Sequence, residues 1–177
     1  EDLFEEDRGA DAEDDGERAS LREWQEHDRR SLEVLGELGF DLVPLKLPDA
    51  FPVSSLSFIL TAEAATAFDE LTRSGRDDLL VRQIENAWPN VFRQGRTIPA
   101  VEYLQANRVR TLAMQRMEEI LERIDVYVAP SFGGDNLLLT NLTGHPAVVL
   151  PNGFREDGTP TSITFCGRLF GEQSLLS

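Results

Sequence analysis

The sequence has few of the residues that build disulfide bonds or metal sites. Cys166 is the single cysteine among 177 residues, and His27 and His145 are the only histidines. One cysteine excludes an internal disulfide framework and a cysteine metal cluster, and two isolated histidines lack the spacing of metal ligands. We therefore expect no metal and no other cofactor.

Long hydrophobic runs are also missing. A membrane-spanning helix needs about 18 or more consecutive apolar residues, and no run approaches that length. No segment resembles a signal peptide, and the single cysteine fits a reducing compartment. These absences predict a soluble, cytoplasmic protein with no membrane partner.

Positive charge is scarce and negative charge is unevenly placed. Lys46 is the only lysine, and the formal net charge is -15. This balance argues against a nucleic acid partner, because affinity for phosphate backbones comes from clustered Lys and Arg. Residues 1–18 hold ten acidic residues, and such a segment buries too little apolar surface to order itself. We predict an acidic lead-in, either a loop or disordered, over residues 1–19 and an ordered domain over residues 20–177.

Hydrophobic periodicity predicts an α/β domain in which helices flank a mixed sheet. A capping box from Ser20 to Glu23 indicates the start of the first helix, and Gly39 indicates its end. The other helices are expected from Ser54 to about Arg73, Asp77 to Asn86, Pro99 to Arg123 and Leu137 to Thr143. The strands are expected at Asp41 to Leu47, Asp125 to Pro130, Pro146 to Leu150 and Thr161 to Phe165.

A polar cluster precedes the strand at Pro146. In the run TNLTGHPAVVLPNGF, the side chains of Thr140, Asn141, Thr143 and His145 surround Gly144. These residue types serve helix ends and turns, and they also suit a binding site at a strand entrance. We expect Gly144 to hold a backbone conformation or a close contact that a β-branched residue cannot accept.

No catalytic residue is identified in the chain. A Ser-His-acid hydrolase needs a serine on a sharp turn with a histidine in reach, and no serine has a G-x-S-x-G context. Lys46 lies between leucines in a predicted strand. The only serine pair, Ser54-Ser55, has no flanking glycines that would expose backbone amides to an oxyanion. It is better explained as a helix N-cap.

The C-terminal third resembles the amidase signature family. From Asp125 to Leu176 the motifs follow in order: DVYVAP, then TNLTGHPAVVLPNG, then GTP, then GRLFGE. The upstream stretches LGELGFDLVPLKLP, EAATAF and EYLQANRVR are similar to the family as well. The family includes bacterial amidases, fatty acid amide hydrolase and the A subunit of the glutamyl-tRNA amidotransferase. Ser131 stands where the family often has Thr.

The resemblance implies the C-terminal part of an amidase signature-type fold without its catalytic half. The family hydrolyses amides with a serine that a second serine and a lysine activate, and a loop rich in Gly and Ser holds the oxyanion. The sequence contains no such loop, and Lys46 matches no catalytic position. We therefore expect the chain to supply fold and substrate-cleft wall, with Thr140, Asn141, Thr143 and Gly144 as wall residues, and to be inactive alone.

Two alternatives remain open. The chain could be a non-catalytic half-domain that binds a partner or associates with itself through an uncovered sheet face, or it could be part of the A subunit of an amidotransferase. In the main interpretation a small-molecule amide is the substrate of the full-length enzyme only. The resemblance also implies that the apolar strands DVYVAP and PAVVL belong to a sheet built to be covered on both faces.

Overall fold

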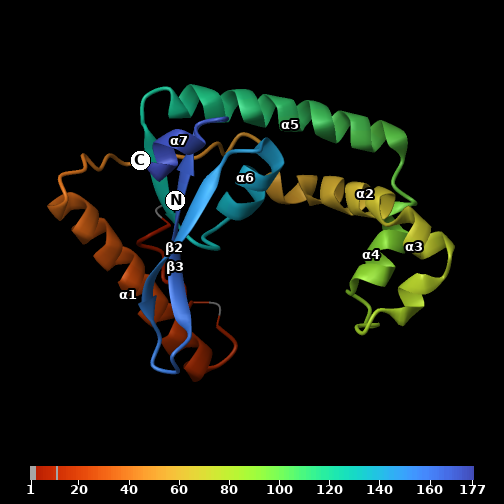
Figure 1. Ribbon diagram of the computed structural model, residues 1–177, viewed down its shortest axis with the longest axis horizontal. Coiled ribbons are helices and arrows are strands. Elements are labelled where there is room, and N and C mark those ends of the chain that lie inside the picture. The colour runs from red at the N-terminus through yellow and green to blue at the C-terminus, as the bar shows by residue number, and fades with distance from the viewer. Residues whose placement is uncertain (1–2, 11) are drawn as a thin grey trace. The chain divides into compact units, whose positions relative to one another are not determined.

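A computed structural model describes residues 3–10 and 12–177 of the chain (Figure 1). The chain divides into two compact units. Unit 1 comprises residues 1–48 and 116–177, and unit 2 comprises residues 49–115. The sequence predicted a different boundary, between an acidic lead-in over residues 1–19 and a domain over residues 20–177. That boundary stays a prediction.

Unit 1 is built on an antiparallel sheet of three strands. These are β1 (Val126–Pro130), β2 (Ala147–Phe154) and β3 (Pro160–Gly167), in the order β1-β3-β2. The register places Val128 opposite Phe165 and Val149 opposite Thr164. An α/β fold with flanking helices is confirmed. The parallel pairing that a mixed sheet requires does not occur among the described strands.

The predicted strand from Asp41 to Leu47 is wrong. This segment has no regular secondary structure, and most of it is exposed. Its alternating apolar residues suit a strand, but Pro44 lacks the N–H that a sheet ladder uses. The predicted strands at Asp125 to Pro130, Pro146 to Leu150 and Thr161 to Phe165 are confirmed as β1, β2 and β3.

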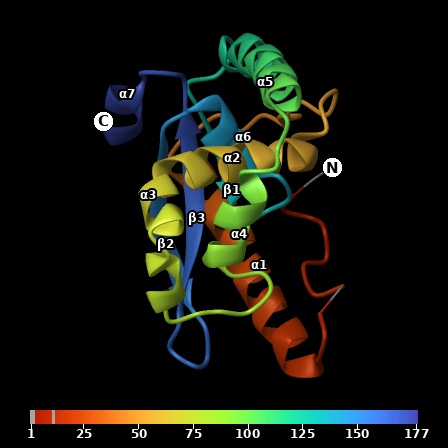
Figure 2. The ribbon, with the colours of Figure 1, turned by 90° about the vertical axis from the view of Figure 1, so that its right-hand side faces the viewer.

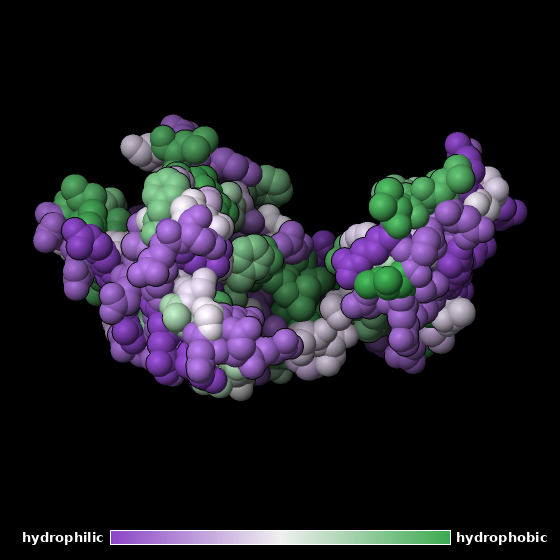
Figure 3. Space-filling view, turned by 90° about the horizontal axis from the view of Figure 1, so that it is seen from below, coloured by the Kyte–Doolittle hydropathy of each residue, from purple (hydrophilic) through white to green (hydrophobic). Residues whose placement is uncertain are grey.

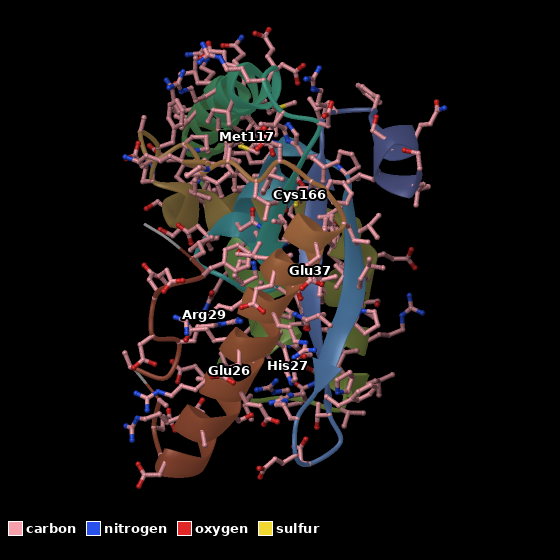
Figure 4. All side chains as sticks on the ribbon, turned by 90° about the vertical axis from the view of Figure 1, so that its left-hand side faces the viewer. Glu26, His27, Arg29, Glu37, Met117 and Cys166 are labelled. Atoms are coloured by element: carbon pink, nitrogen blue, oxygen red, sulfur yellow. The ribbon has the colours of Figure 1, made fainter. Side chains whose placement is uncertain are left out.

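Helix α1 (Asp15–Glu37) packs against β2 and β3. Figure 4 shows His27 of α1 near β2, where its Nε2 lies 3.3 Å from the carbonyl oxygen of Phe154. The same figure shows Met117 and Cys166 in the interior of unit 1, and both are fully buried. Short helices α6 (Asn136–Thr143) and α7 (Glu172–Leu176) complete the unit.

The predicted N-cap of α1, Ser20, lies six residues after the observed one. Asp14 is the N-cap, and its carboxylate accepts a hydrogen bond from the backbone N–H of Glu17 at 2.8 Å. The Glu17 carboxylate reaches back and accepts from the N–H of Glu13 at 2.7 Å. Two amides at the helix start are thereby satisfied. The acidic composition of the run concealed this capping pattern.

Arg8 attaches the N-terminal segment to unit 1. Its guanidinium donates to the Asp28 carboxylate at 2.8 Å and to the carbonyl oxygen of Ser131 at 2.9 Å. It also lies 4.6 Å from the ring centroid of Trp24, within the range of a cation–π contact. Asp28 is fully buried and accepts a second bond from the Asn152 amide at 2.8 Å. Burial raises the pKa of Asp28, while Asn152 and Arg8 act in the opposite direction.

Unit 2 is helical. It contains α2 (Phe58–Ala67), α3 (Asp69–Arg73), α4 (Trp88–Gly95) and two short 3-10 helices, η1 (Val53–Ser57) and η2 (Arg76–Leu79). Figure 2 shows α2, α3 and α4. Helix α5 (Ala100–Leu121) confirms the predicted long helix, and its residues belong to both units.

The sequence pattern gave three wrong assignments in unit 2. The single helix expected from Ser54 to Arg73 is interrupted at Phe68, which has a non-helical φ of -107° and ψ of 24°. The helix expected from Asp77 to Asn86 is reduced to η2. Helix α4 lies between the helices expected at Asp77 to Asn86 and at Pro99 to Arg123, where the pattern predicted no helix, and its first turn holds Pro89, a position that proline favours. Phe68 stacks on Phe92 of α4 with ring centroids 4.9 Å apart, so tertiary packing overrides the local pattern.

No helix in the described part of the chain is both long and apolar enough to cross a membrane.

Candidate functional site

The candidate site begins where α6 ends. Gly144 follows the helix with a φ of +79°, in the left-handed region. Its N–H and that of His145 both donate to the Thr140 carbonyl oxygen, at 2.8 and 3.2 Å. A Cβ on Gly144 would meet only Leu169, at 3.8 Å. The predicted requirement for glycine is confirmed, and the backbone conformation rather than crowding imposes it.

His145 is buried and held in one tautomer. The Thr143 hydroxyl donates its proton to the Leu139 carbonyl oxygen at 2.8 Å, so it can only accept from His145 Nδ1, which lies 2.7 Å away. The proton of the neutral ring is therefore on Nδ1. Burial lowers the pKa of His145, and the charge of Glu118 opposes this shift. Because the folded environment disfavours the imidazolium, His145 is neutral at pH 7.

A cavity of about 400 Å³ opens beside this corner, within unit 1. Its walls come from the loop after β1, from α6 and from the faces of β2 and β3. Six lining residues are polar through a hydroxyl or amide group: Ser131, Asn136, Thr140, Asn141, Ser162 and Thr164. The other six are Phe132, Leu137, Gly144, His145, Ala147 and Val149.

Three of the four predicted wall residues lie at this cavity. Thr140, Asn141 and Gly144 line it. Thr143 does not, because its side chain is buried between Leu139 and His145 and supports the corner from within. The Asn141 side-chain amide donates to the Leu137 carbonyl oxygen at 2.7 Å, one turn earlier in α6. The role of these residues in substrate binding stays a prediction.

Sequence reasoning missed the contribution of β3 and of the β1 loop. The hydroxyl oxygens of Ser131 and Thr164 lie 2.8 Å apart, and Ser162 lines the same cavity. Ser162 and Thr164 share one face of β3 because side chains alternate along a strand. The run TSIT shows this alternation in the sequence. The sequence does not show that β1 pairs with β3, and this pairing brings Thr164 close to Ser131.

The arrangement does not assemble a nucleophile in the described residues. The Ser131 hydroxyl pairs with the Thr164 hydroxyl, and a serine needs a base to become nucleophilic. His145 offers Nδ1 to Thr143, and its Nε2 has no hydrogen-bond partner in the described structure. Within residues 3–10 and 12–177, no three His, Cys, Asp or Glu side chains gather as metal ligands would.

Comparison with known proteins relates the chain to amidases. It is 27% identical over 173 residues to an amidase of Pseudomonas putida, across 84% of this chain and 36% of that protein. It is 37% identical over 92 residues to the A subunit of the glutamyl-tRNA(Gln) amidotransferase of Wolinella succinogenes, across 42% of this chain and 20% of that protein. The chain thus spans well under half the length of these relatives. No family model matches the chain.

Solved structures share the fold. A crystal structure of an amidase matches with a TM-score of 0.72 and 18% identity, over 88% of this chain and 40% of the other. A bacterial aryl acylamidase belonging to the amidase signature enzymes matches with a TM-score of 0.65 and 19% identity, over 88% and 39%. The similarity lies in the C-terminal part of these relatives. By sequence and by fold, the chain is similar to the C-terminal region of amidases and of amidase signature enzymes.

Proposed function

We propose that the chain forms one wall of the substrate cleft in an amide hydrolase of the amidase signature type. The observation that carries the proposal is the 400 Å³ cavity at the corner where α6 meets β2. This corner is built from TNLTGHPAVV, one of the motifs that resemble the family. A concave site with a few convergent polar groups on an otherwise apolar wall is typical of small-molecule binding.

In this proposal the reacting groups come from outside the chain. Amide cleavage by a serine requires an activating base and preorganised donors at the developing oxyanion. Ser131 and Ser162 line the cavity, but among the described residues neither hydroxyl is bonded to a basic side chain. Gly133 and Gly134 follow Ser131, but they are not the Gly- and Ser-rich loop of the family. The chain then contributes shape and polar contacts to the cleft, while a serine, a second serine and a lysine act from the catalytic half of the family's domain. The single buried cysteine supports a cytoplasmic location.

The 177-residue chain alone is expected to show no turnover of simple anilides above a buffer blank. The reason is the missing base and oxyanion donors, whose removal costs several orders of magnitude in rate. Release of the aniline can be followed by absorbance over hours at high protein concentration. Turnover that disappears when a serine of this chain is replaced by alanine would contradict the proposal.

A second function is favoured by the exposed apolar side chains of β2. Val149, Leu150 and Phe154 are 58%, 47% and 67% exposed, and Figure 3 shows hydrophobic surface among the hydrophilic surface of the molecule. Within the described residues β2 pairs only with β3, and such an edge invites pairing with another chain. A half-domain that associates with itself would scatter light as a dimer or larger species, whereas a monomer would remove this alternative.

A further inference from the structure

We infer that the cavity binds a neutral carboxamide group. It excludes charged groups of the same shape, namely a carboxylate and an amidinium. This inference rests on the proposed function, since it names the substrate class of the same site. None of the twelve lining residues is Asp, Glu, Lys or Arg, although 28% of the chain is charged. The walls offer hydroxyl, amide and hydrocarbon groups only.

Arg8 contacts the cavity residue Ser131, and its charge is already compensated. Arg8 donates to the carbonyl oxygen of Ser131, but its guanidinium is also paired with the buried Asp28 carboxylate at 2.8 Å. His145 is neutral, because burial lowers its pKa. A charged ligand group in the cavity would therefore lose hydration without gaining a partner of opposite charge, which is costly.

The polar lining groups match a group that both donates and accepts hydrogen bonds. One of the Ser131 and Thr164 hydroxyls donates to the other, so the pair retains one donor and open acceptor sites. The Thr140 hydroxyl bonds the carbonyl oxygens of Asn136 and Leu137, at 3.0 and 3.1 Å, so its own oxygen can only accept. A neutral carboxamide carries an N–H donor and a carbonyl acceptor, whereas a carboxylate has no donor and an amidinium has no acceptor.

Three probes of nearly equal shape test this inference on the 177-residue chain. Benzamide is neutral, benzoate is an anion and benzamidinium is a cation at pH 7. Binding is followed by ¹H–¹⁵N chemical shifts of the backbone amides of Thr140, Asn141 and Gly144. We expect benzamide to bind at least ten-fold more tightly than either ion, with the shift changes confined to the cavity.

A matched pair of variants tests whether the cavity, and not the overall charge of the chain, determines the relative affinities of the three probes. Val149 lines the cavity and Leu150 does not, and successive residues of a strand point to opposite faces. Both side chains are substantially exposed, at 58% and 47%, so a carboxylate at either position leaves the fold intact. Val149→Glu is expected to raise the affinity for benzamidinium at least ten-fold, whereas Leu150→Glu is expected to leave it unchanged.

The outcomes separate this inference from the proposed function. Equal or tighter binding of benzoate or benzamidinium in the unmodified chain overturns the inference, and so does the absence of binding by all three probes. A rise in benzamidinium affinity of equal size in both variants also overturns it, because it would reflect long-range charge. If benzamide binds as expected while the chain alone hydrolyses anilides, the inference stands and the proposed absence of a nucleophile fails.

Discussion

Gly95→Ala is expected to lower the free energy of unfolding of unit 2 by about 2 to 3 kcal/mol, the cost of forcing atoms into a closely packed contact. Gly95 ends α4 where that helix meets α2. A Cβ at this position would lie 2.5 Å from the Thr61 carbonyl oxygen and 2.6 Å from the Cβ of Ala65. Both atoms are fixed to the backbone of α2, so the two helices would have to separate.

Gly36→Ala is the matched control. Gly36 lies near the end of α1, and a Cβ there would meet no atom within 4 Å. Alanine in a helix is about 0.5 to 1 kcal/mol more favourable than glycine, so this variant should be slightly more stable. The two tryptophans report the units separately in a urea titration, because Trp88 lies in unit 2 and Trp24 in unit 1. An unchanged midpoint for the Trp88 indole signal in Gly95→Ala would contradict the close helix contact.

Asp28→Ala is expected to destabilise unit 1 by about 3 kcal/mol or more, because removing one partner leaves a buried charge uncompensated. The Arg8 side chain is only 12% exposed, and the Asp28 side chain is fully buried. The substitution also removes the shorter of the two hydrogen bonds by which the Asn152 amide links β2 to α1, and it leaves the bond to the Ser31 hydroxyl at 3.3 Å. We expect the urea midpoint reported by Trp24 to fall.

Two further variants check the cause of this loss. Glu119→Ala removes an exposed ion pair with Arg116, and its cost should stay below about 1 kcal/mol. Arg8→Leu in the Asp28→Ala background should cost less than Arg8→Leu alone, because the two side chains act as a pair. Additive costs in this double-mutant cycle would show that Arg8 and Asp28 do not stabilise each other.

The sequence predicted the part of the fold where local pattern and tertiary packing agree. The apolar runs at β1 and β2 and the glycine that ends α6 each carry a local signal, and all three are present. The cavity corner at Thr140, Asn141 and Gly144 was found for the same reason. Helix ends and tight turns require particular residue types, so a single sequence can reveal them.

The features that were missed depend on contacts between distant segments. Gly95 looked like a loop residue because its helical role depends on the surface of α2. Arg8 looked like part of a solvated acidic lead-in, yet its partner Asp28 lies 20 residues away and Ser131 lies 123 residues away. Thr164 reaches the cavity through strand pairing. Spacing along the chain carries no signal for such contacts.

Photolabelling tests the central claim most directly, because it locates the surface that an amide contacts. A benzamide that carries a diazirine is irradiated with the 177-residue chain, and the tryptic peptides are identified by mass spectrometry. Residues 124–155 form one tryptic peptide and residues 156–168 the next, and together they hold all twelve cavity residues. The account predicts label in these two peptides that excess benzamide removes. Competed label found only in residues 49–115 would contradict it.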